Sequence, residues 1–242
     1  MTTRVQPFPP PVTNFGAGEQ EPLLGRPEEE EEIALGYYLV TGTAFIAQLG
    51  GIALVLVVYI SVYSHDMCLF SVHPLLNALG IALLLESTLL LQPTHSSVQK
   101  HKGAIIHSVL NSVAFILMYS AFIVVVVSKV RNQEHHFGSA HAILGLITYI
   151  LLFMQATFGM IQFYFPSILG GEAKAKEIYK YHRMSGYVIF LFILSTAVAV
   201  TYVPYVHDVL KIRTWVVIVA GVLILGGVLP RADLGKFGFK QG

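Results

Sequence analysis

Four histidines stand out because each lies just inside an apolar stretch of the sequence. They are His73, His107, His141 and His182, and successive members are 34, 34 and 41 residues apart. Ionisable side chains are costly inside a lipid bilayer and are therefore functional there by default. Neutral imidazole is a common metal ligand and also carries protons. The set therefore predicts either a site for a metal-containing group or a path for ions.

The composition is that of a membrane protein. Apolar residues make up 55% of the 242-residue chain, and charged residues make up only 12%. A water-soluble chain of this length could not bury so much apolar surface. The single cysteine, Cys68, excludes a disulfide framework within one chain. Lipid is therefore the expected solvent for most of the sequence.

Six apolar runs are long enough, or nearly so, to cross a hydrocarbon core of roughly 30 Å. We predict an all-α integral membrane protein in which spans two to five form a central four-helix bundle and spans one and six are peripheral. The predicted spans cover residues 37–60, 69–91, 103–127, 139–165, 179–202 and 212–229. They form one domain over residues 37–230, between a disordered acidic and Pro-rich tail at 1–36 and a short tail at 231–242.

The distribution of lysine and arginine predicts the orientation. Eleven of these residues lie on the side of both termini and only four on the opposite side. Cytoplasmic loops carry an excess of Lys and Arg, so both termini are expected in the cytosol.

The spacing sorts the four histidines into two layers. Successive spans start on opposite faces of the membrane, so His73 and His141 share the non-cytoplasmic depth, while His107 and His182 share the cytoplasmic depth. Alternate helices of a bundle can face one another across its core. Two histidines at one depth can supply both axial ligands of a haem iron. The layers would lie roughly 18 Å apart in a 30 Å core, which predicts an electron relay across the bilayer.

At these residues the chain resembles the cytochrome b561 family of transmembrane di-haem reductases, in its short single-domain branch. The resemblance is carried by residues 69–74 (LFSVHP), 139–145 (SAHAILG) and 181–186 (YHRMSG), and by His107 after a basic stretch. It implies two non-covalent haem b groups, held by His73 with His141 and by His107 with His182. It also implies an ascorbate-dependent oxidoreductase that passes electrons from cytosolic ascorbate to monodehydroascorbate or ferric iron on the far side.

Four basic residues on the cytosolic side are the predicted ascorbate contacts: Lys100, Lys102, Lys180 and Arg183. Ascorbate is an anion near neutral pH and needs cationic or N–H donors. The alternative is that these side chains only set the topology and extend to the lipid headgroups. Similar ascorbate-binding members carry lysines seven and three residues before the third-span histidine, whereas this chain has Lys100 and Ala104 there. No catalytic side chain is predicted, and Glu86, the one carboxylate deep in a span, has no assigned role.

A haem-free transporter that uses the histidines for metal or proton passage is the alternative function. Against it, a metal site needs its ligands together, whereas these fall in two layers. A scaffold that has kept the fold and lost activity is a third option. The expected partners are the substrates and the lipid bilayer. No nucleic acid is expected to bind, and a homodimer is left open. The acidic di-leucine pattern Glu19–Leu24 predicts a sorting adaptor and an endomembrane (endosomal, lysosomal or vacuolar, endoplasmic reticulum or vesicle) rather than the plasma membrane.

Overall fold

The computed structural model describes residues 35–92, 96–233 and 237, which form six long helices and no strand. All six are long and apolar enough to cross a membrane. The predicted all-α protein with six spans is therefore confirmed, and the chain is a multi-pass membrane protein. The helices are α1 (Ala44–Tyr63), α2 (Val72–Leu91), α3 (Ser97–Arg131), α4 (Ala140–Tyr164), α5 (Glu172–Ala199) and α6 (Thr214–Val228). The predicted sorting pattern Glu19–Leu24 lies outside the described residues.

Two helices begin earlier than the apolar runs predict. Helix α3 starts at Ser97 rather than at 103, and α5 starts at Glu172 rather than at 179. In α3 the Ser96 side chain accepts a hydrogen bond from the Gln99 backbone N–H, which caps the first turn. The first turns of α5 are rich in Ala, Glu and Lys, which favour helix in water. Hydropathy finds only the part of a helix that lipid surrounds, so it misses these polar extensions.

The first helix instead begins later than predicted. Residues Leu35–Leu39 form a short 3-10 turn, and α1 starts only at Ala44. Between them Gly42 has a φ of 58°, a left-handed conformation that glycine adopts without a steric penalty. The predicted start at Tyr37 is therefore wrong for the regular helix.

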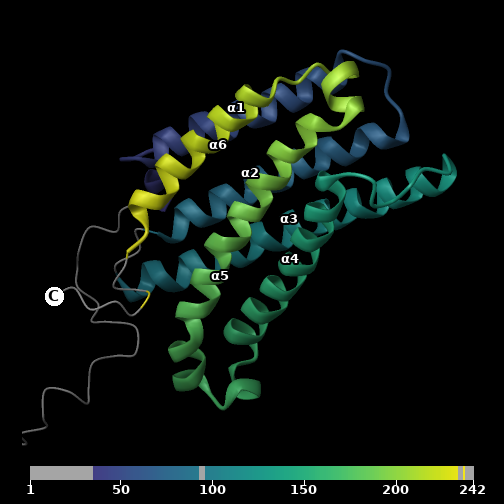
Figure 1. Cartoon of the computed structure of the whole chain (residues 1–242). Helices are drawn as coiled ribbons and strands as arrows, with labels where there is room; N and C mark the ends of the chain where they lie inside the picture. The colour runs from purple at the N-terminus through teal and green to yellow at the C-terminus, as the bar shows by residue number, and fades with distance from the viewer. Residues whose placement is uncertain (1–34, 93–95, 234–236, 238–242) are drawn as a thin grey trace, which may run out of the picture.

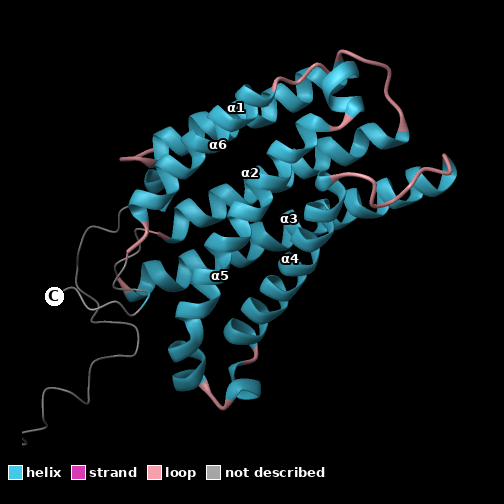
Figure 2. Ribbon diagram, viewed as in Figure 1, coloured by secondary structure: helices cyan, strands magenta, loops and turns pink. Residues whose placement is uncertain are grey.

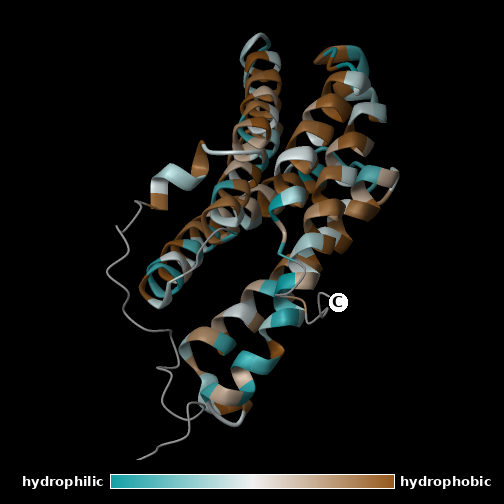
Figure 3. Cartoon of the chain, turned by 90° about the vertical axis from the view of Figure 1, so that its left-hand side faces the viewer, coloured by the Kyte–Doolittle hydropathy of each residue, from teal (hydrophilic) through white to brown (hydrophobic). Residues whose placement is uncertain are grey.

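The helices associate as three antiparallel pairs: α1 with α6, α2 with α3, and α4 with α5 (Figure 1). Short loops join the helices, and α1 also packs against α2 (Figure 2). Both described ends of the chain meet at one end of the molecule, where the Arg231 guanidinium donates to the backbone oxygens of Thr41 (2.8 Å) and Tyr38 (2.9 Å). We call this the terminal end and the opposite one the distal end. Apolar residues run along the helices, as Figure 3 shows.

Two glycines allow α1 and α6 to lie against each other. A Cβ atom added at Gly50 would come within 2.6 Å of the Ala220 carbonyl oxygen, and one at Gly227 within 2.6 Å of the Thr43 carbonyl oxygen. The Thr43 hydroxyl also donates to the Gly227 carbonyl at 2.9 Å. Small residues at a helix interface let backbones approach in lipid, where packing drives association.

Replacing Gly227 by alanine should therefore separate α1 from α6. The added methyl group meets backbone atoms that cannot move alone, and overpacking of this kind costs about 1–3 kcal/mol. We expect the free energy of unfolding in detergent to fall by this amount. The matched control is Gly226→Ala, since nothing lies within 4 Å of a Cβ atom there. Equal stability of the two variants would contradict the assigned contact.

Candidate functional site

The four histidines occupy two levels of the bundle. His73 and His141 are each the second residue of their helices, α2 and α4, and lie at the distal end. His107 and His182 lie ten residues into α3 and α5, toward the terminal end. The ring of His73 reaches the carbonyl of Ala121, which lies 14 residues beyond His107 on α3. At 1.5 Å per residue, the levels are about 21 Å apart.

The distal pair brings two rings from different helix pairs into contact. The ring centres of His73 and His141 are 6.4 Å apart, and the ring planes are inclined by 85°. The His73 Nδ1 atom lies 2.9 Å from the Ala121 carbonyl oxygen on α3, and the His141 Nδ1 atom lies 3.0 Å from the Thr196 carbonyl oxygen on α5. Each ring is therefore held by the neighbouring helix of its own pair.

The segment before α2 also contributes to the distal pair. The Phe70 ring stacks on the His73 ring with 5.8 Å between the ring centres. The Cys68 backbone N–H donates to the Ser71 hydroxyl oxygen at 3.1 Å, which fixes the short turn Leu69–Ser71. A hydrogen bond with the Ser71 side chain also lowers the pKa of the Cys68 thiol.

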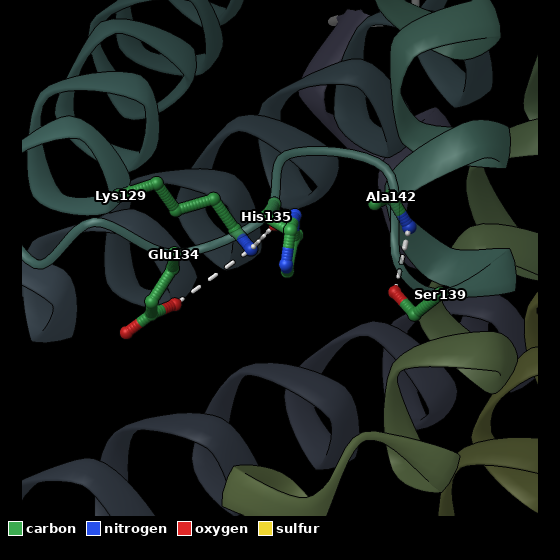
Figure 4. A network of polar contacts seen from close by, with 5 residues as sticks. All are labelled: Lys129, Glu134, His135, Ser139 and Ala142. Carbon is green, nitrogen blue, oxygen red and sulfur yellow. Dashed lines mark hydrogen bonds and ion pairs between the residues drawn. The ribbon is translucent and has the colours of Figure 1, made fainter.

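The loop between α3 and α4 is fixed by Lys129. Its ammonium group donates to the His135 carbonyl oxygen at 2.7 Å and lies 3.7 Å from a Glu134 carboxylate oxygen (Figure 4). The Ser139 hydroxyl then caps α4 by accepting from the Ala142 backbone N–H at 3.2 Å. These contacts set where α4 begins, and therefore where His141 lies.

The two histidines of the terminal pair differ in how their rings are held. The His107 Nδ1 atom lies 3.1 Å from the Ser87 carbonyl oxygen on α2. The His182 Nδ1 atom is buried and has no hydrogen-bond partner among the described residues. The ring of His182 packs on Gly159 of α4, where an added Cβ atom would come within 2.7 Å of its Cε1 atom. His107 lies close enough to His182 for a charge on either ring to act on the other.

The backbone contacts favour one tautomer for three of the rings. A carbonyl oxygen can only accept, so the Nδ1 atoms of His73, His107 and His141 carry the proton. The Nε2 atom of each ring then keeps a free lone pair and can bind a metal ion.

Two asparagines form a polar support that our reading of the sequence missed. The Asn77 amide donates to the His73 carbonyl oxygen (2.9 Å) and accepts from the Tyr149 hydroxyl (2.8 Å). The Asn111 amide donates to the His107 carbonyl oxygen (2.8 Å) and accepts from the Ser87 hydroxyl (3.1 Å). In both helices the asparagine follows the histidine by four residues, and this repeated spacing is the signal that could have found them.

The predicted ascorbate contacts lie at the terminal end, on the two helices α3 and α5. Lys100 and Lys102 are exposed on the first turns of α3. Lys180 is also exposed, with its ammonium group 5.1 Å from the centre of the Tyr181 ring. Arg183 is partly buried and interacts electrostatically with Tyr187 and Asp233.

Glu86 belongs to a separate polar contact between α1 and α2. Its carboxylate accepts a hydrogen bond from the Gln48 amide at 2.9 Å. The next residue, Ser87, points to α3 and supports His107. Glu86 therefore faces away from the terminal histidine pair.

The histidines thus form pairs rather than larger clusters. Within the described part of the chain, no group of three or more His, Cys, Asp or Glu side chains could hold a metal ion. The fold and site together define a six-span helical membrane protein with paired histidines in two layers. No curated protein matches the chain. The family model for eukaryotic cytochrome b561, however, matches residues 72–203, more than half of the chain.

The chain therefore belongs to the cytochrome b561 family. The matched residues begin at the start of α2 and end just after α5, so they contain all four histidines and exclude α1 and α6. Membership makes the protein a transmembrane oxidoreductase of electron transport, from a family that binds haem b.

A methyl group at position 159 should disturb the terminal layer alone. In Gly159→Ala the new Cβ atom displaces the His182 ring, and we expect less haem per protein in a pyridine haemochrome assay. Gly145→Ala is the matched control on the same helix, because its nearest neighbour would be a Thr196 methyl group at 3.8 Å. Haem content that falls equally in both variants would argue against a special role for Gly159.

Proposed function

We propose that the protein carries electrons from cytosolic ascorbate, through two haem b groups with bis-histidine ligation, to monodehydroascorbate or ferric iron on the other side of the membrane. His73 and His141 would hold one haem, and His107 and His182 the other. The spacing of the distal rings is the observation that carries the proposal.

That spacing would suit two imidazoles that hold one metal ion between them. A metal–imidazole bond is about 2 Å long and a ring centre lies about 1.2 Å from its nitrogen, so two imidazoles that held one ion from opposite sides would have centres about 6.4 Å apart. The ring centres of His73 and His141 are 6.4 Å apart. The contacts at Nδ1 leave Nε2 for the iron, and such partners also raise the basicity of a ligand. Bound haem supplies a one-electron carrier at each level.

The terminal end suits an anionic electron donor. Three exposed lysines and the partly buried Arg183 lie on the helices that carry His107 and His182. The excess of basic residues on this side supports a cytosolic orientation. An ascorbate anion held there would release one electron toward the terminal layer and one proton to water, and become monodehydroascorbate. The cations would hold the donor and keep its charge paired.

The proposal is tested by the visible spectrum of the purified protein. We expect a Soret band and reduction by ascorbate. A protein without a Soret band would contradict the haem sites. Haem that dithionite reduces but ascorbate does not would contradict the donor.

Replacing His107 by alanine should remove the terminal haem and block entry of electrons. We expect the variant to bind less haem and to lose ascorbate-driven electron transfer across vesicle membranes. His101→Ala is the control, because His101 is an exposed residue of the same helix. Electron flux that persists in the His107 variant would refute the terminal layer as the entry site.

Lys100→Ala should weaken ascorbate binding without removing haem. A hydrogen bond to a charged group contributes about 1.5–3 kcal/mol, so we expect KM for ascorbate to rise about tenfold or more. Lys211→Ala, at the distal end, should leave KM unchanged in the same reduction assay. An unchanged KM in the Lys100 variant would favour a role in topology alone.

The remaining expectations concern the setting of the protein in the cell. The di-leucine pattern at Glu19–Leu24 supports an endomembrane location, with a sorting adaptor as partner. Assembly as a homodimer is compatible with a haem-binding unit that lies within one chain.

A further inference from the structure

The face of α4 that packs on α5 carries two glutamines, Gln155 and Gln162, on either side of Gly159. Gln155 donates from its amide to the His182 carbonyl oxygen at 2.7 Å, and Gly159 contacts the His182 ring. Gln162 continues this face at the same spacing of three to four residues. Its backbone carbonyl oxygen accepts a hydrogen bond from the Tyr179 hydroxyl at 3.4 Å. Gln162 therefore lies one turn from the residue that supports the His182 ring.

The carboxamide of Gln162 is fully buried and unsatisfied. The residue is 2% exposed, and neither its Oε1 nor its Nε2 atom has a hydrogen-bond partner among the described residues. The same is true of the His182 Nδ1 atom. A buried polar group without a partner is costly, and such groups are rare in native proteins. Two of these atoms, Gln162 Oε1 and His182 Nδ1, lie on facing turns of two helices and are better explained if they serve one another.

The directions of the two side chains bring them together. Side chains on a helix tilt toward its N-terminus. Helices α4 and α5 are antiparallel, so the Gln162 side chain leans toward the level of Gly159, and the His182 ring leans toward the level of Tyr179. Each therefore leans toward the other. A glutamine side chain spans about one helical turn, roughly 5 Å, which is the separation between these levels.

We propose that Gln162 is a positioning residue for His182. Its Oε1 atom accepts a hydrogen bond from the His182 Nδ1–H group, directly or through one water molecule. The fourth histidine would then have a partner as the other three do, and its Nε2 atom would be free for the iron. This inference rests on the proposed haem ligation.

The partner of His182 differs from the others in kind. Ala121, Ser87 and Thr196 hold their histidines through backbone carbonyls, which no substitution can remove. At His182 the acceptor is a side chain, so sequence alone can change its strength. An acceptor at Nδ1 makes imidazole a stronger donor to iron and favours the ferric state. Gln162 would therefore lower the midpoint potential of the terminal haem.

The test is a redox titration of the full-length protein with Gln162→Met and Gln162→Glu. Methionine keeps the shape and removes the acceptor, so we expect the potential of the terminal haem to rise while that of the distal haem stays fixed. Glutamate restores an acceptor, so we expect its potential to equal or fall below that of the unmodified protein. To assign the two potentials, the same titration is run on the His107→Ala variant. The redox transition that is missing from this variant belongs to the terminal haem.

Thr201→Val is the control for general destabilisation, because Thr201 is fully buried and bonds to Thr214 far from the terminal pair. It should move neither potential. The inference is overturned if Gln162→Met shifts neither haem or both, or if Gln162→Glu raises the potential as methionine does. If the unmodified protein binds both haems, these outcomes overturn only the role of Gln162 and leave the proposed function intact. Absence of haem from the unmodified protein would instead refute the proposed function itself.

Discussion

An imidazole inside a hydrocarbon layer needs partners for both nitrogens, and this requirement organises the bundle. His73 on α2 uses a carbonyl of α3, and His107 on α3 uses a carbonyl of α2. His141 on α4 uses a carbonyl of α5. These hydrogen bonds join helices within the pairs α2/α3 and α4/α5. The contact between the rings of His73 and His141 instead crosses from one pair to the other.

The hydrogen bonds within helix pairs and the ring contact between pairs have different roles in assembly. Hydrogen bonds at Nδ1 orient the rings of His73, His107 and His141 before any ligand arrives, and they leave the Nε2 atoms of these rings free to bind one. A group bound there would join two hairpins that otherwise share few contacts. The match to the family covers these hairpins and ends at their boundaries.

The sequence predicted the parts of this arrangement that depend on composition and chain length. Six spans follow from apolar runs, and the two histidine layers follow from their spacing. The polar first turns of α3 and α5 were not predicted, because hydropathy does not identify the parts of a helix that lie in water. The partners at Nδ1 are backbone carbonyls of any residue type, so no residue pattern could identify them. Asn77 and Asn111 could have been found by their repeated spacing, whereas Gln162 gains meaning only once α5 lies against α4.

The close contact between α1 and α6 has a consequence for how the chain is made. Gly50 and Gly227 join α1 to α6, so this contact cannot form until the chain has been synthesised as far as α6. The hairpins α2/α3 and α4/α5 join neighbours in sequence and can form as soon as each emerges into the membrane. The order of translation therefore leaves the histidine-bearing core without its α1–α6 neighbour until α6 enters the membrane.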